Sequence, residues 1–440
     1  MKIAYVTAGA AGMYCGSCLH DNTLAKALID AGQDVALIPT YTPIRTDEVD
    51  VSIDRVFYGA VNVFLEQKSS IFRHTPRFVD SLLDAKPLLN WVSGRGSSVD
   101  AKDLGDLTLS VLLGEDGRQS KELAKLVQFL KEDYRPDLVH LTNSMFLGFA
   151  REIKREVGCP VLCSVQGEEI FLDELPDPQR SDVRAALRER AQDVDGFVAT
   201  SDYYVDFMSD YLGVDRSIVH QVDLGINLDG FDAVDRQSAG DPFVMGFLAR
   251  ICPEKGPHLA IEAFRRLCDR AGRSNIRMRM AGYCGPRDHA YRDALLASVA
   301  QWGLTDSFEY LGEVDRPGKI AFLQGLDVMT LPTTFREPKG LSVIEALAVG
   351  TPVVVPEHGT FPELVQETDG GLLFKPGDTE GLTQALDTLR THPDHRRRLG
   401  EHGRQVVHAR RDASTMADNT MKVYRRFLAG GRPKESSQNG

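Results

Sequence analysis

The chain has 440 residues, 42% of them hydrophobic and 26% charged, which is ordinary for a globular protein and long enough for two or three domains. Its formal net charge of -12 argues against nonspecific binding to nucleic acid. No apolar run approaches the roughly 18 residues of a membrane span. We expect a cytoplasmic protein, and short basic stretches such as Arg396–Arg398 leave a weak peripheral contact with anionic lipid open.

The seven cysteines are odd in number and widely spread, which is not the pattern of a disulfide framework. Cys15 and Cys18 form a single Cys-x-x-Cys, and no second pair or nearby histidine pair completes a metal set. We therefore expect no metal site here, and the role of the two thiols stays open.

Taken in chain order, the first half alternates short apolar runs with helical patterns, which indicates a parallel sheet flanked by helices. A domain over residues 1–235 is predicted, with an insertion at about 41–118 that breaks the rhythm. Strands are expected at Lys2–Thr7, Asp34–Pro39, Asp137–Leu141, Pro160–Val165 and Gly196–Thr200, and helices at Ser17–Ala31, Ser120–Tyr134 and Ser181–Gln192.

A second series of the same kind predicts another nucleotide-binding-type domain over residues 236–412. Its expected strands are Phe243–Ala249, Arg277–Gly282, Phe308–Leu311, Val328–Leu331 and Pro352–Val355, and its expected helices are His258–Ala271 and Leu341–Val349. An amphipathic helix is predicted over 413–429, and a disordered tail over 430–440.

The most informative motif is a pair of glutamates, Glu337 and Glu345, that bracket the start of the helix expected at Leu341–Val349. The N-terminus of a helix offers backbone N–H groups and a positive dipole end, which suit a phosphate. A carboxylate on either side of that phosphate can accept hydrogen bonds from sugar hydroxyls. The pattern therefore indicates a site for a nucleotide sugar.

Together with the strand before it and the Gly-Thr-Pro turn after it, this motif resembles the family 4 retaining glycosyltransferases, which include glycogen and starch synthases. The resemblance is dense from about Val244 to Phe374 and looser elsewhere. It implies an α/β fold of GT-B architecture, in which two Rossmann-like domains face a central cleft and the C-terminal helix returns to the N-terminal domain.

The resemblance also implies roles for particular residues. Arg250 and Lys255 match the cations that clamp the donor diphosphate, and Gly340, Leu341 and Ser342 would supply backbone N–H groups to it. Glu337 would receive hydroxyls of the transferred sugar, and Glu345 those of the ribose.

The first loop is glycine-rich, and Gly12 and Gly16 are expected to let the backbone approach the substrate closely. Family members usually have a Gly-Gly pair where this chain has Cys15-Gly16. They often also carry a histidine in the N-terminal domain near the reacting carbon of the sugar. Here Thr142 or Gln166 stands in that place, and Gln166 is taken as the catalytic candidate, while His140 is expected to be a buried structural residue.

These observations predict metal-independent transfer of a sugar, with retention, from a UDP-, GDP- or ADP-linked donor to a carbohydrate, lipid-linked or small-molecule hydroxyl acceptor. No cofactor is expected beyond the donor substrate, and Asp193-Val194-Asp195 is interpreted as a helix end rather than a metal motif. The alternatives are a non-catalytic nucleotide-sugar-binding protein and a nucleotide-sugar epimerase of the same fold. The donor, the acceptor and the oligomeric state stay open.

Overall fold

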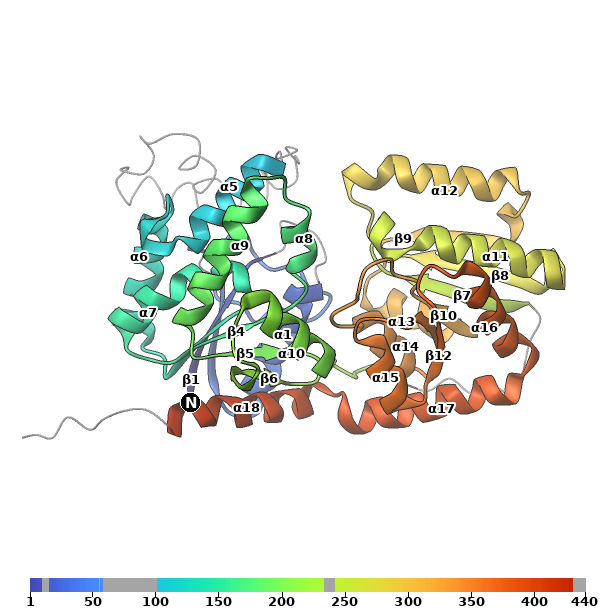
Figure 1. Ribbon diagram of the computed structural model, residues 1–440. Coiled ribbons are helices and arrows are strands. Elements are labelled where there is room, and N and C mark those ends of the chain that lie inside the picture. Colours follow the sequence, from blue (N-terminus) through green and yellow to red (C-terminus); the bar gives the residue numbers. More distant parts are fainter. Residues whose placement is uncertain (10–15, 55, 58–100, 233–241, 430–440) are drawn as a thin grey trace, which may run out of the picture. The chain divides into compact units, whose positions relative to one another are not determined.

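The computed structural model describes residues 1–9, 16–54, 56–57, 101–232 and 242–429. The chain forms two compact units, which are treated separately below (Figure 1). Unit 1 comprises Met1–Thr200, Val205–Asp223 and the C-terminal segment from Ser414, and unit 2 comprises Ser201–Tyr204 and Leu224–Ala413. The predicted boundary at residues 235–236, most of the predicted insertion and the predicted tail lie outside the described residues.

Unit 1 is built around a parallel sheet whose described strands follow the order β2-β1-β3-β4-β5-β6. The strands are β1 (Lys2–Thr7), β2 (Asp34–Pro39), β3 (Leu138–Leu141), β4 (Val161–Ser164), β5 (Gly196–Ala199) and β6 (Val219–Gln221). The helices are α1 (Gly16–Asp30), α5 (Ala101–Leu112), α6 (Ser120–Gln128), α7 (Ala150–Val157), α8 (Glu169–Asp173), α9 (Gln179–Arg190), α10 (Asp202–Leu212) and α18 (Ala413–Ala429), with short helical turns η2 (Gly114–Asp116), η3 (Phe129–Tyr134), η4 (Ser144–Phe149), η5 (Ala191–Asp193) and η6 (Arg216–Ile218).

Unit 2 repeats this plan with strand order β12-β11-β10-β7-β8-β9. Its strands are β7 (Phe243–Leu248), β8 (Ile276–Ala281), β9 (Phe308–Gly312), β10 (Val328–Thr330), β11 (Val353–Pro356) and β12 (Gly371–Phe374). Its helices are α11 (Pro257–Ala271), α12 (His289–Gln301), α13 (Arg316–Gln324), α14 (Leu341–Ala348), α15 (Phe361–Thr368), α16 (Thr379–Thr391) and α17 (Pro393–Arg410), with turns η7 (Pro253–Lys255), η8 (Arg273–Asn275), η9 (Pro286–Asp288) and η10 (Thr305–Ser307).

The strands form where the sequence has short apolar runs, and the central ones are buried along their whole length. Every residue of β3, β4, β5 and β11 is buried. Continuous apolar runs of this kind are typical of parallel sheets that are covered on both faces. The α/β fold class and the strands expected in both halves are therefore confirmed.

Each sheet has one point where the strand order reverses. In unit 1 the reversal lies between β1 and β3, which pair in parallel, and in unit 2 it lies between β7 and β10. In open parallel sheets, ligands bind outside the carboxyl ends of the strands at such a point. The topology therefore directs attention to the loops that follow β7 and β10 in unit 2, and β1 and β3 in unit 1.

The helix expected at Ser120–Tyr134 is divided into α6 and the π-helical turn η3. η3 ends at Tyr134; the next residue, Arg135, has a left-handed conformation with φ 53° and is followed by Pro136. A proline cannot donate the backbone hydrogen bond that would continue the helix. The chain leaves the helix here and enters β3.

Helix α18 belongs to unit 1 although it follows unit 2 in the sequence, as the resemblance implied. Tyr424 of α18 is fully buried and hydrogen-bonds to Nδ1 of His140 in β3. The other ring nitrogen of His140 lies 2.8 Å from Oγ of Ser164 in β4. His140 is thus the buried structural histidine that was predicted, and it ties the last helix to the centre of the first sheet.

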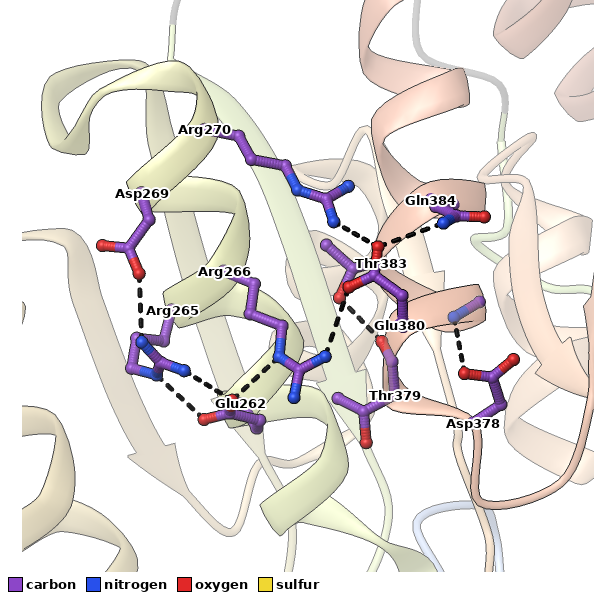
Figure 2. A network of polar contacts seen from close by, with 11 residues as sticks. Glu262, Arg265, Arg266, Asp269, Arg270, Asp378, Thr379, Glu380, Thr383 and Gln384 are labelled. Atoms are coloured by element: carbon purple, nitrogen blue, oxygen red, sulfur yellow. Dashed lines mark hydrogen bonds and ion pairs between the residues drawn. The ribbon is translucent and has the colours of Figure 1, made fainter.

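A surface network of ion pairs joins α11 to α16 within unit 2 (Figure 2). The carboxylate of Glu380 on α16 pairs with Arg266, at 3.3 Å, and with Arg270 on α11. Arg266 also pairs with Glu262 at 2.9 Å, which extends the network along α11. These side chains are partly exposed, so the network supports the packing of the two helices modestly.

Within the described part of the chain, none of the helices combines the length and the apolar character that a membrane crossing requires.

The buried site of His140 predicts a specific sensitivity to acid. Burial lowers the pKa of His140 to about 3, from an ordinary value of 6.5. Between these pH values the unfolded chain binds a proton that the folded chain does not, so stability falls as the pH falls. Urea unfolding of wild-type protein should lose about 1.4 kcal/mol per pH unit from this group below pH 6.5.

The variant His140→Gln should be less stable at pH 7 but should lose stability less steeply as the pH is lowered to 4. The exposed His289, replaced in the same way, serves as the control. Equal slopes for wild type and His140→Gln would contradict the assignment.

Candidate active site

Three loops of unit 2 meet at the carboxyl ends of neighbouring strands. The loop after β10 is joined to the loop after β7, because the backbone N–H of Thr334 donates to the carbonyl of Glu254 at 2.9 Å. It is joined to the loop after β11 as well, because the N–H of Thr360 donates to the carbonyl of Glu337 at 2.8 Å. The point where the strand order reverses is therefore lined by one connected set of loops.

Glu337 and Lys255 form an ion pair at this place. Nζ of Lys255, which follows β7, lies 2.6 Å from Oε2 of Glu337, which follows β10. The ammonium also lies 4.8 Å from the ring centroid of Phe335, at cation–π distance. Glu337 is only 6% exposed, so this charge is held at the base of the loops rather than in bulk water.

Glu337 is ionised at neutral pH despite its burial. Burial raises its pKa, but the charge and hydrogen bond of Lys255 act in the opposite direction, and so does the N–H of Gly340. Together they hold the pKa below its ordinary value. The Gly340 N–H donates to Oε1 of Glu337 at 3.4 Å, so this carboxylate is oriented from two sides.

Gly340 directs the chain into α14. It has a φ of +70°, a conformation that favours glycine, and it is the residue before the helix. Leu341 and Ser342 are the first two helical residues, and the N–H of Val343 returns to the carbonyl of Gly340 at 3.0 Å. The first N–H groups of a helix have no partner within it. The end of α14 beside Glu337 can therefore receive an anion.

Glu345, one turn into α14, has a lysine partner of its own. Nζ of Lys319 on α13 lies 2.6 Å from Oε1 of Glu345. Glu345 is 5% exposed and Lys319 is 8% exposed. Both glutamates of the motif are thus held by a lysine that comes from elsewhere in unit 2.

Arg250 lies just beyond β7 and is exposed. The chain that carries it is fixed by a hydrogen bond from the N–H of Ile251 to the carbonyl of Tyr283, at 2.8 Å. Unit 2 therefore contains Arg250, Lys255, Glu337, Gly340, Leu341, Ser342 and Glu345 of the predicted site residues.

The remaining predicted site residues belong to unit 1. Gly16 is the exposed first residue of α1, whereas Gly12 and Cys15 lie outside the described residues. Gln166 follows β4 and is 5% exposed. Its amide nitrogen donates to Oδ1 of Asp21 and to the carbonyl of Thr142, each at 2.9 Å. The donor group of Gln166 is therefore engaged inside unit 1, and its catalytic role stays a prediction.

Asp21 is the centre of a buried polar cluster at the carboxyl ends of the central strands β1 and β3 of unit 1. Its side chain is fully buried and accepts hydrogen bonds from hydroxyls of Thr7 (2.6 Å), Thr142 (2.5 Å) and Tyr5 (2.9 Å). Burial raises the pKa of Asp21, but the hydrogen bond and charge of His20, with the threonine hydroxyls, hold it below its ordinary value. The cluster ties α1 to the ends of β1 and β3.

The segment Asp193-Val194-Asp195 begins at the last residue of η5, as the predicted helix end, and its two carboxylates bind other groups of unit 1. Oδ2 of Asp195 accepts a hydrogen bond from the backbone N–H of Val161 at 2.8 Å, and Oδ1 pairs with Lys154 at 2.8 Å. Oδ2 of Asp193 pairs with Arg151 at 3.2 Å. Within the described ranges, no group of three or more histidine, cysteine or acidic residues is arranged to hold a metal ion.

Lys319 and Asp21 were not predicted as site residues from the sequence, although the sequence pattern places each of them at a buried position of a helix. Lys319 lies three and four residues before Phe322 and Leu323, which are buried, so helical periodicity places a lysine on an apolar face. Asp21 follows His20 in the first half of α1, a helix whose buried residues include both. A charged residue at a core position indicates a buried partner.

Two family models match the chain over most of its length. Glycosyl transferases group 1 matches residues 231–406, and the glycosyl transferase 4-like domain matches residues 22–225. Among characterised relatives, a phosphatidyl-myo-inositol mannosyltransferase of Mycobacterium leprae is 27% identical over 56% of this chain and 63% of its own length. A glycogen synthase of Mycobacterium tuberculosis is 24% identical over 68% of this chain and 71% of its own. The chain thus spans less than two thirds of the first of these relatives.

Solved structures share the fold of the whole chain. Sucrose-phosphate synthase from Thermosynechococcus elongatus superposes with a TM-score of 0.70 at 18% identity, over 98% of this chain and 99% of that one. HepE of Anabaena in complex with UDP-glucose gives 0.67 at 18% identity, over 97% and 100%. Residues 231–406 therefore form a glycosyl transferases group 1 domain, residues 22–225 form a glycosyl transferase 4-like domain, and the chain has the GT-B fold.

Proposed function

We propose that this protein transfers a sugar from a nucleotide-diphosphate sugar to a hydroxyl group of an acceptor, with retention at the anomeric carbon and without a metal ion. The observation that carries the proposal is the pair of lysine-held, buried glutamates that flank the N-terminus of α14. A diphosphate at that helix end would lie between two carboxylates, each within reach of sugar hydroxyls.

The diphosphate would be bound by fixed positive groups. Leu341 and Ser342 would offer backbone N–H groups, Gly340 would share with the diphosphate the N–H that it donates to Glu337, and Lys255 and Arg250 would offer full charges. Because negative charge grows on the leaving diphosphate during transfer, such preorganised groups stabilise the transition state more than the ground state. They would do here what a divalent cation does in metal-dependent transferases, which is why we propose that no metal is needed.

The two carboxylates would divide the hydroxyls between them. Glu337, next to Lys255, would receive hydroxyls of the transferred sugar, and Glu345 would receive those of the ribose. Hydrogen bonds to a charged acceptor are shorter and stronger than neutral ones. In retaining transfer, the leaving phosphate would take the proton of the acceptor hydroxyl on the same face of the sugar, so that no protein base is required and positioning supplies most of the rate.

The relatives and the similar solved structures suggest donors and acceptors to test. HepE was solved with UDP-glucose, and starch synthase IV of Arabidopsis thaliana with ADP and acarbose. Relatives named D-inositol 3-phosphate glycosyltransferase and phosphatidyl-myo-inositol mannosyltransferase act on a small cyclitol phosphate and on a lipid-linked inositol. We propose a donor linked to UDP, GDP or ADP, and an acceptor hydroxyl on a carbohydrate, a lipid-linked sugar alcohol or a small metabolite.

The first experiment is a thermal-shift screen of the purified protein with UDP, GDP, ADP and their common sugar conjugates. A ligand that binds only the folded state raises the melting temperature, by an amount set by its concentration relative to its dissociation constant. One nucleotide series should stabilise the protein, and the conjugate that does so is then tested for sugar transfer. The absence of any shift across all three series would contradict the proposed function.

Replacing Glu345 with glutamine should weaken nucleotide binding without unfolding the protein. Glutamine keeps the shape of the side chain but removes the charge that strengthens hydrogen bonds from hydroxyls. We expect about a tenfold rise in the dissociation constant, measured by calorimetry, because a hydrogen bond to a charged group is worth about 1.5–3 kcal/mol. An unchanged constant for the nucleotide would remove Glu345 from the binding site.

The double variant Arg250→Ala with Lys255→Ala should slow turnover by several orders of magnitude, since each preorganised electrostatic donor is worth about 3 kcal/mol in the transition state. The matched control removes two exposed cations of unit 2, Arg277 and Lys375, in the same way. Steady-state kinetics gives the turnover of both double variants, and their melting temperatures verify that they are folded. Near-wild-type turnover of the first variant would place the diphosphate elsewhere.

A further inference from the structure

We propose that Lys319 is a positioning residue for the nucleotide, acting by holding the carboxylate of Glu345 in the orientation that receives the ribose hydroxyls. This inference rests on the proposed function, because it assumes that Glu345 faces the ribose. Lys319 lies on α13, outside the Glu337–Glu345 segment. Its role would be to set the preference of the site for ribose over deoxyribose.

The geometry of the pair is specific. The Lys319 ammonium reaches from α13 to α14 and lies 2.6 Å from Oε1 of Glu345. The side chain of Lys319 is 10% exposed and that of Glu345 is 6% exposed. A long, flexible lysine that is confined to this depth has lost most of its rotamer freedom. The contact is therefore a fixed part of the fold and not one of several surface arrangements.

The helix that carries Lys319 is anchored at both ends. At its start, Asp315 caps α13 by accepting from the N–H of Gly318 at 2.9 Å, and the N–H of Lys319 donates to the carbonyl of Asp315 at 2.7 Å. Near its end, the hydroxyl of Thr351, in the turn that follows α14, donates to the carbonyl of Leu323 at 2.7 Å. The distance between the two helices is thus set independently of the ion pair.

Stability alone does not account for a lysine at this position. Lys319 shares the buried face of α13 with Phe322 and Leu323. An apolar side chain would continue that face, and replacing a buried ion pair by apolar residues of similar volume is often neutral or stabilising. A charged pair at such a place points to a requirement of the site and not of the core.

The requirement that fits is the orientation of a carboxylate. The terminal torsion of a glutamate is broad and roughly two-fold, so an unrestrained carboxylate presents its oxygens over a wide range of angles. An ammonium at Oε1 removes that freedom and balances the charge. Ribose hydroxyls would then meet a preoriented, charged acceptor, and binding would not include the cost of ordering it.

The test compares ribonucleotides with deoxyribonucleotides. Wild-type protein is titrated by calorimetry with UDP, GDP and ADP, and the tightest binder is paired with its 2′-deoxy and 3′-deoxy counterparts. We expect the loss of one hydroxyl to weaken wild-type binding about tenfold. In Lys319→Met the ribonucleotide should bind about tenfold more weakly and the deoxynucleotides nearly as before, so the ratio falls below about threefold.

Three further variants separate positioning from general damage. Lys319→Arg should restore most of the ratio, because it keeps a donor with a positive charge. The double variant Lys319→Met with Glu345→Gln should bind the ribonucleotide no more weakly than Glu345→Gln alone, since both substitutions act through one carboxylate. Lys375→Met, at an exposed site of unit 2, should leave the ratio unchanged.

A ratio in Lys319→Met equal to that of the wild type overturns the inference while the proposed function stands, because the lysine would then be structural. If Lys319→Met melts too low to titrate, Lys319→Gln carries the same comparison. Wild-type protein that binds none of the three nucleotides overturns the proposed function, and this inference with it.

Discussion

The ion pair between Lys255 and Glu337 is the interaction on which the candidate site at the carboxyl ends of the unit 2 strands depends. It connects the loop after β7 to the loop after β10, the two strands between which the strand order reverses. The parallel sheet alone would bring the ends of these strands together, but it would not orient their loops. A 2.6 Å contact between opposite charges, largely removed from water, holds the two loops together alongside the backbone hydrogen bond from Thr334 to Glu254, and it keeps the carboxylate ionised.

This pairing has a consequence for binding. On the proposed function, a diphosphate bound here would share the Lys255 ammonium with Glu337, and Lys255 would not neutralise it completely. When a sugar is attached to the diphosphate, its hydroxyl groups would donate hydrogen bonds to Glu337. The ion pair would then weaken binding of the bare nucleoside diphosphate and strengthen binding of its sugar conjugate, which would favour release of the diphosphate product after transfer.

Much of the fold and part of the candidate site could be predicted from the sequence. β1 and β2 have the bounds predicted for them, Lys2–Thr7 and Asp34–Pro39, because the apolar residues within each segment are the ones that the sheet buries. Glu337 and Glu345 were recognisable because their spacing is local, within one loop and one helix. Lys319 and Asp21 were not, since a partner for a buried charge is supplied by the tertiary fold, and no periodicity shows which distant side chain will reach it.

Buried carboxylates have different kinds of partner in the two units. In unit 1 the carboxylate of Asp21 accepts from three hydroxyls and from the amide of Gln166, groups that come from β1 and from the ends of β1, β3 and β4. With this many hydrogen bonds, Asp21 holds the carboxyl ends of these strands together, and Gln166 takes part in the same contacts. In unit 2, Glu337 and Glu345 are instead each paired with a lysine ammonium, and Glu337 also accepts a hydrogen bond from the N–H of Gly340. On the proposed function, the lysine-paired carboxylates of unit 2 would be the ones that receive sugar hydroxyls, whereas the hydroxyl and amide donors around Asp21 would hold the carboxyl ends of β1, β3 and β4 in place.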